Sequence, residues 1–92
     1  MAKDLQSSIS DYQQILIELL FTDLDLAFTF LDTARVSSWP ETQRRNVEHA
    51  VKAHKEVSAK ALQFEMPDSA RKELDAGLRS LKERISRFGV KL

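Results

Sequence analysis

Proline and glycine are scarce in this chain, and their positions divide it into segments that can each form one helix. The 92 residues contain two prolines and two glycines. Pro40 and Pro67 separate three segments, because proline removes a backbone donor and clashes with the preceding turn of a helix. Gly89 follows the third segment as a helix-ending residue. Gly77 is the exception, since it lies inside a helical pattern at a cost of up to about 1 kcal/mol relative to alanine.

The first segment, about residues 4–35, has apolar residues at steps of three and four, which is the helical period. One strip comprises Leu5, Ile9, Tyr12, Leu16, Leu20, Ala27, Phe30 and Ala34, and a second comprises Ile17, Leu24, Phe28 and Leu31. Together they cover more than half of the circumference, so this helix needs at least two neighbours. Phe21 lies at the edge of the arc and indicates a further contact, which a second subunit would supply.

The second and third segments predict helices over about residues 39–65 and 67–88. The second helix has two alternative starts: a capping box opened by Ser38, or Pro40 as the first helical residue with Trp39 just outside. Its inward face comprises Val47, Ala50, Val51, His54, Ser58, Ala61 and Leu62, and the seam of the third comprises Leu74, Leu78, Leu81, Ile85 and Phe88. Trp39 would cover the end of the helical hairpin, or else stack on a ligand.

Short connections make sequential helices antiparallel. The sequence therefore predicts an all-α fold, an up-down-up antiparallel three-helix bundle that forms a single domain over residues 1–92. The first helix is longer than its neighbours, so residues 4–10 would overhang and either fray or be covered by a second subunit.

Composition and charge exclude several classes of function. The formal net charge is zero, whereas general nucleic-acid binding needs an excess of Lys and Arg. No cysteine is present, so thiolate chemistry and zinc–sulfur sites are excluded, and a reducing cytoplasm fits. The longest apolar stretch carries carboxylates and is too short to span a membrane, and the N-terminal residues do not form a secretory signal. We expect no membrane association and no cofactor.

Asp23 and His54 are polar residues on otherwise apolar helix faces. In an antiparallel hairpin that turns near residues 37–38, the two positions lie at nearly the same height. A hydrogen-bonded pair would satisfy both groups and penalise other registers of the hairpin. The pairing predicts a raised pKa for the His54 imidazole, or alternatively a depressed pKa for Asp23.

Two other interpretations of Asp23 stay open. A capping pattern from Thr22 to Asp25 would break the first helix at this point. A metal or acid–base site is the other alternative, but one histidine with one aspartate provides too few ligands for a metal site. We therefore expect no bound metal.

The stretch His49-Ala50-Val51-Lys52-Ala53 resembles the H-x-L-K-G core of histidine phosphotransfer domains, which are all-helical bundles with an exposed histidine that is transiently phosphorylated. The resemblance implies His49 as the phosphoryl acceptor and Lys52, one turn on, as its cationic partner. It covers only these five residues. The glycine of that family is Ala53 here, which weighs against close docking of a response regulator.

Arg44 and His49 have the R-x4-H spacing of a family of small helical ribonucleases, and this resemblance implies cleavage of a phosphodiester. On one regular helix the two side chains diverge by about 140°, so they would not converge on a substrate. The basic residues of the third helix are interrupted by Glu83 and lack interleaved aromatic residues, which favours a solvated outer face over a nucleic-acid surface.

We therefore expect a non-enzymatic helical-bundle protein that binds a protein partner or forms a homodimer. The expected surface lies on the side of Phe21 and Phe28, together with Trp39. The alternative function is a phosphotransfer-like signalling module that uses His49 and Lys52.

Overall fold

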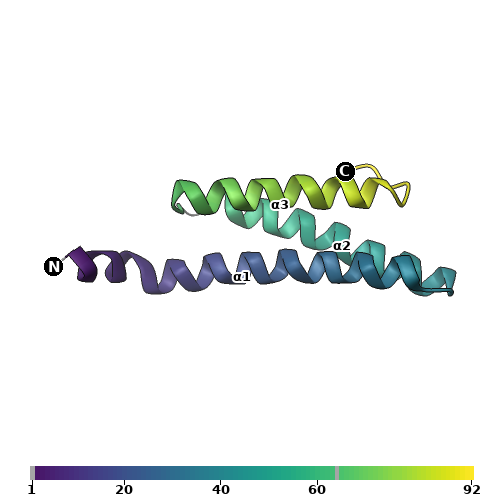
Figure 1. Ribbon diagram of the computed structural model, residues 1–92, viewed down its shortest axis with the longest axis horizontal. Helices are drawn as coiled ribbons and strands as arrows, with labels where there is room; N and C mark the ends of the chain where they lie inside the picture. Colours follow the sequence, from purple (N-terminus) through teal and green to yellow (C-terminus); the bar gives the residue numbers. More distant parts are fainter. Residues whose placement is uncertain (1, 64) are drawn as a thin grey trace.

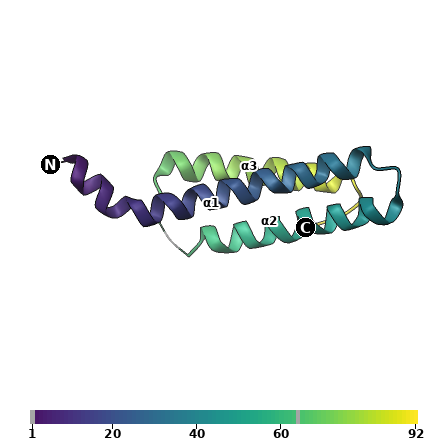
Figure 2. The same ribbon diagram turned by 90° about the horizontal axis from the view of Figure 1, so that it is seen from below.

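Three helices make up the structure, a computed structural model that describes residues 2–63 and 65–92, with side chains from residue 11 onward. They form an antiparallel up-down-up bundle in which α1 packs against both other helices (Figure 1, Figure 2). No strand occurs in the described ranges, so the predicted all-α class is confirmed. The helices are α1 (Ala2–Val36), α2 (Pro40–Ala61) and α3 (Asp68–Ser86).

The length of α1 sets the length of the molecule. Its 35 residues span about 52 Å at 1.5 Å per residue, and the longest dimension of the protein is 56 Å. The Gln13 side chain donates a hydrogen bond to the Glu65 carbonyl at 3.4 Å, so the connection from α2 to α3 passes α1 at this level. The turns before Gln13 extend beyond the other helices in both views, which confirms the predicted overhang. Its coverage by a second subunit stays a prediction.

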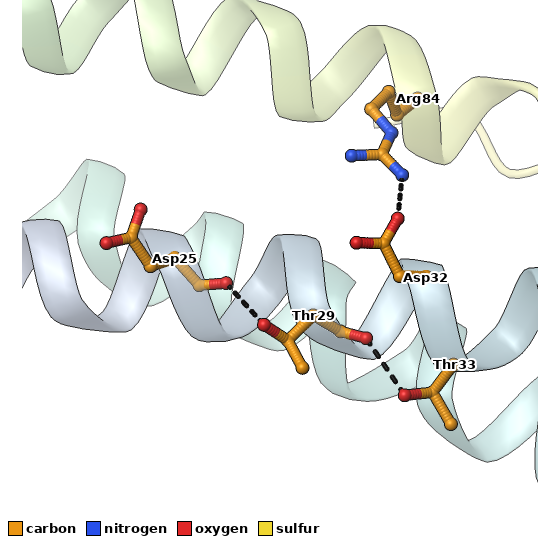
Figure 3. Close-up of polar contacts among 5 residues, drawn as sticks. All are labelled: Asp25, Thr29, Asp32, Thr33 and Arg84. Atoms are coloured by element: carbon orange, nitrogen blue, oxygen red, sulfur yellow. Dashed lines mark hydrogen bonds and ion pairs between the residues drawn. The ribbon is translucent and has the colours of Figure 1, made fainter.

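Continuity of α1 through residues 22–25 shows that the helix-break interpretation of Asp23 is wrong. Buried side chains on both sides of this position pack against the other helices and hold the helical backbone. On the polar face, the Thr29 hydroxyl donates to the Asp25 carbonyl at 3.1 Å, and the Thr33 hydroxyl donates to the Thr29 carbonyl at 3.0 Å (Figure 3). These threonines satisfy their hydroxyls within the helix.

The core consists of small and branched apolar side chains from all three helices. α1 and α2 each contribute two buried alanines, and α3 contributes leucine and isoleucine. Val57 is almost fully buried although the sequence analysis did not place it on the inward face. The buried apolar residues are Ile17, Leu20, Leu24, Ala27, Leu31, Ala34, Val47, Ala50, Val57, Ala61, Leu74, Leu81 and Ile85.

The start of α2 follows the proline alternative. Trp39 is the extended N-cap residue, with φ −99° and ψ 115°, and Pro40 is the first helical residue. No side chain caps this end, so the capping-box interpretation is wrong. The Ser37 hydroxyl instead accepts a hydrogen bond from the Trp39 amide at 3.2 Å. The Gln43 side chain donates to a carbonyl in the last turn of α1 at 3.0 Å and fastens the two helices together.

The other helix ends differ from the predicted ones by a few residues. α2 ends at Ala61 rather than near residue 65, because its last carbonyl accepts a hydrogen bond from Arg71 of α3 at 2.9 Å. α3 ends at Ser86 rather than residue 88. Gly89 has a φ of +84°, the left-handed conformation that favours glycine, which fits its predicted role as a helix-ending residue. After this turn, Val90 packs against the core.

Candidate functional site

Large apolar side chains lie exposed along one side of α1. Tyr12 is 74% exposed, Ile15 55%, Leu19 53% and Leu26 49%. Their positions are i, i+3, i+7 and i+14, so they share one side of the helix. We call these four residues the α1 stripe. Asp23 lies four residues after Leu19 and three before Leu26, so it interrupts the stripe.

The α1 stripe exists because the apolar arc of α1 is wider than two neighbouring helices can cover. One part of the arc, including Leu24 and Phe28, faces α3. The adjoining part, including Phe30, faces α2. The remaining part of the arc stays largely exposed, although Leu26 lines a hollow beside α2. Sequence periodicity detected the wide arc but did not show which part would be left over.

The predicted interaction surface around the phenylalanines is mostly used inside the bundle. Phe21 and Phe28 are half-buried and pack against the core. The Arg84 guanidinium lies 5.2 Å from the centroid of the Phe28 ring and covers it. Trp39 is 72% exposed at the end of the hairpin, so it does not close that end.

Arg84 also joins α3 to α1 by an ion pair. Its Nη2 donates to Asp32 Oδ1 at 2.5 Å (Figure 3). The guanidinium thus contacts an aromatic face and a carboxylate at once, a combination that arginine provides and lysine does not. This contact covers part of the half-buried Phe28 ring and reduces the area that a partner could reach.

Asp23 and His54 do not contact each other, which makes the predicted pair wrong for this structure. His54 lies on the α3 side of α2, beside the Leu78 backbone and the Lys82 side chain. Burial, with a smaller contribution from the nearby Lys82 cation, lowers the pKa of His54, whereas the pair predicted a raised pKa. Asp23 lies on the opposite flank of α2, in a hollow that it shares with Lys52.

The predicted Asp23–His54 pair is wrong because of the direction in which His54 projects from α2, and not because of the height of the two residues along the bundle. Three contacts to α1 give the register of the chain that follows it: Gln13 with Glu65, the Ala34 carbonyl with Gln43, and Phe30 with His49. Their numbering confirms an antiparallel register close to the predicted one. However, Ala53 faces α1, and the next residue is rotated by about 100° around the helix, toward α3.

His49 is exposed, as predicted, and its ring lies against Phe30 of α1, with centroids 5.0 Å apart and planes at 33°. A hollow of about 220 Å³ brings His49 and Lys52 together with the carboxylates of Asp23 and Glu56. Both residues of the phosphotransfer alternative therefore face one hollow. Two carboxylates on its wall would oppose a phosphoryl dianion.

Arg44 lies away from this hollow. It lines a different groove on the other flank of α2, and its guanidinium is 3.8 Å from the Glu41 carboxylate. Arg44 and His49 thus face different sides of the helix, and the arrangement does not converge on one phosphodiester.

That groove is the largest hollow described in the molecule, with a volume of about 640 Å³. It runs between the outer side of α2 and the residues after α3. The groove is lined by Pro40, Gln43, Arg44, Val47, Glu48, Val51, Lys52, Lys55, Phe88 and Val90. Sequence reasoning missed it because its two walls are about 40 residues apart in the chain and meet only in the folded bundle.

In comparisons with known proteins, no family model, no curated protein and no solved structure matches this chain. Across residues 2–63 and 65–92, no helix is long and apolar enough to cross a membrane. The same ranges contain no group of three or more His, Cys, Asp or Glu residues that could hold a metal ion. The described part of the molecule thus presents two apolar surfaces, the α1 stripe and the groove beside α2.

Proposed function

We propose that this chain is a non-enzymatic helical module that binds protein through the α1 stripe, with self-association as the simplest case, in the cytoplasm. The observation that carries the proposal is the row of exposed side chains at Tyr12, Ile15, Leu19 and Leu26. Anchors at i, i+3 and i+7 are the spacing by which one helix lies in an apolar groove of another protein.

The magnitudes of burial and association free energy support a weak contact. Fully burying a large apolar side chain contributes about 1.5–3 kcal/mol, and the stripe residues are already partly covered. Four such residues would supply several kcal/mol in total. Association costs about 4–15 kcal/mol in lost freedom of motion, so the stripe needs a complementary surface on its partner.

Sedimentation velocity over a range of about 1 µM to 1 mM tests this proposal. We expect concentration-dependent self-association of the wild-type chain, and its loss in Leu19→Ser. Val36→Ser is the matched control, because Val36 is 74% exposed but lies at the end of α1, ten residues or about 15 Å beyond the last stripe residue, Leu26. A wild-type chain that stays monomeric throughout, or equal effects of both substitutions, would contradict self-association through the stripe.

Phosphotransfer through His49 is the second candidate. The exposure of His49 and its position beside Lys52 support it, while the nearby carboxylates of Asp23 and Glu56 oppose it. Incubation with acetyl phosphate would produce an acid-labile phosphohistidine that His49→Gln abolishes. Absence of the modification in the wild type, and also in Asp23→Asn with Glu56→Gln, would eliminate this candidate.

A further inference from the structure

Charge is strongly segregated along this chain although its formal sum is zero. Residues 4–34 contain six carboxylates and neither lysine nor arginine. The rest of the chain therefore holds all fourteen cations against eight carboxylates. Consequently the α1 stripe lies on a stretch of helix whose only charged side chains are carboxylates, with Lys3 and Arg35 at the two ends of α1. Along the border of the stripe, Asp11, Glu18 and Asp25 recur every seven residues.

The groove beside α2 has the complementary character. Its floor is apolar, formed by Val47 and Val51 of α2 with Phe88 and Val90 from the residues after α3. Its rim carries the cations Arg44, Lys52 and Lys55 against the single carboxylate Glu48, and Lys52 borders both this groove and the hollow that holds Asp23. Within the part of the chain that the structure describes, Lys52 and Lys55 form no ion pair.

The two surfaces also match in length. From Tyr12 to Leu26 the stripe rises about 21 Å, and from Pro40 to Lys55 the groove follows α2 for about 22 Å, at 1.5 Å per residue. From this match in length, polarity and charge, we infer that the groove beside α2 binds the α1 stripe of a second copy of this chain. This inference rests on the proposed function and names the partner surface of the stripe.

Pairing of two α1 stripes is the competing arrangement, and charge disfavours it. An antiparallel pair centred on Leu19 would bring the acidic borders of two α1 helices together. Like charges in direct opposition destabilise a contact between helices. In the groove, the same carboxylates would instead meet Arg44, Lys52 and Lys55.

A contact between two different surfaces is heterologous. Each copy would present one stripe and one groove, so the contact can continue from copy to copy and generate a ring or a chain of molecules. A pair formed by two stripes would stop at a dimer. This difference makes the inference testable separately from the proposed function.

The test uses two variants, one with substitutions in the α1 stripe and one with substitutions in the groove beside α2. The stripe variant is Ile15→Ser with Leu19→Ser, and the groove variant is Lys52→Glu with Lys55→Glu. All four side chains are exposed, so folding should be retained, and circular dichroism with thermal unfolding verifies this. Lys60→Glu with Lys72→Glu is the control for the groove variant, because it changes the net charge equally but spares the groove.

Sedimentation velocity of each variant alone and of their equimolar mixture gives the result. We expect each variant alone to associate at least about tenfold more weakly than the wild type. The mixture should form a closed 1:1 complex, since one variant keeps its groove and the other its stripe. The control variant should associate as the wild type does.

Other outcomes overturn the inference in distinguishable ways. If the groove variant associates like the wild type and the stripe variant does not, the stripe binds elsewhere and the proposed function stands without the groove. If both variants are monomeric and their mixture is monomeric too, the two surfaces are not partners. If the wild type does not associate, both self-association and this inference are wrong.

Discussion

Asp23 interrupts an apolar surface between Leu19 and Leu26, and the groups around its carboxylate determine how that charge affects binding at this surface. The residue is half-buried beside α2, where Lys52 lines the same hollow. It is therefore not a lone carboxylate in a core. In a partner interface, a charge within an apolar stripe restricts which surface and register can bind.

His54 is the residue whose charge state is most constrained by the fold. Burial and the Lys82 cation favour its neutral form and lower its pKa below the ordinary value of 6.5. When acid is added, the unfolded chain takes up a proton at this position before the folded chain does. The contribution of His54 to stability is therefore complete above pH about 6.5 and is lost as the pH falls through its lowered folded value.

We predict that Lys82→Ala raises the pKa of His54, because it removes the nearby positive charge, and that the acid-side loss of stability then becomes smaller and is complete at a higher pH. NMR titration of the imidazole and urea unfolding at several pH values measure the two effects. Lys72→Ala removes a lysine from the same helix and should leave His54 unchanged. Titration of His54 above its ordinary value, with a decrease in Asp23→Asn, would instead restore the pair that the sequence suggested.

At the scale of helices, the contact between α1 and α3 depends on Gly77. A Cβ built on this glycine would lie 2.5 Å from Leu24 Cδ2, so the absence of a side chain allows Leu24 to occupy the space. Leu24 is buried, and it has little freedom to move away. This contact explains why a glycine stands inside a helix despite its unfavourable helix propensity.

Gly77→Ala should therefore destabilise the protein by about 1 kcal/mol, since overpacking costs about 1–3 kcal/mol and the gain in helix propensity offsets about 1 kcal/mol. In a Leu24→Ala background the same substitution should stabilise by up to about 1 kcal/mol. Chemical denaturation of the four proteins in this double-mutant cycle measures the coupling.

Gly89→Ala is the control for that cycle. It should also destabilise, but through its φ of +84°, and nothing lies within 4 Å of its added Cβ. Its effect should therefore be the same with Leu24 or Ala at position 24. Stabilisation by Gly77→Ala in the wild-type background would show that Leu24 moves aside freely and that the packing explanation is wrong.

At the scale of the whole molecule, an acidic helix lies against two helices that hold most of the cations. Arg84 and Asp32 join these parts directly at 2.5 Å, and most other charges are exposed. Interactions between exposed charges are screened by salt, with a Debye length of about 10 Å at 0.1 M and about 3 Å at 1 M. Salt therefore separates the contributions of charge and apolar burial to any contact between copies.

We predict that self-association weakens by at least about tenfold when the ionic strength is raised from about 0.05 M to about 0.5 M, since screening reduces the attraction between the α1 carboxylates and the groove cations. Sedimentation equilibrium measures the dissociation constant at each salt concentration. The Lys52→Glu and Lys55→Glu variant serves as control, because its residual association should lose this dependence. Stronger association at high salt would indicate a purely apolar contact.

Much of the bundle was predictable because local rules decide it. The three segments, their antiparallel order and the overhang follow from the positions of Pro40 and Pro67 and from the helical period of the apolar residues. Gly89 and Val90 also behave as a helix-ending pair should. The end of α2 was not predictable, because a hydrogen bond from Arg71, ten residues away, determines where the helix stops.

The sequence by itself determined the helices, their order and the excess of apolar surface on the first one, because helix formation and amphipathic spacing are local properties. Only the tertiary structure decided which part of that surface stays exposed, on which side of α2 His54 lies, and where a groove opens beside Lys55. A rotation of about 100° separates neighbouring residues on a helix, and only packing against two other helices selects among such rotations.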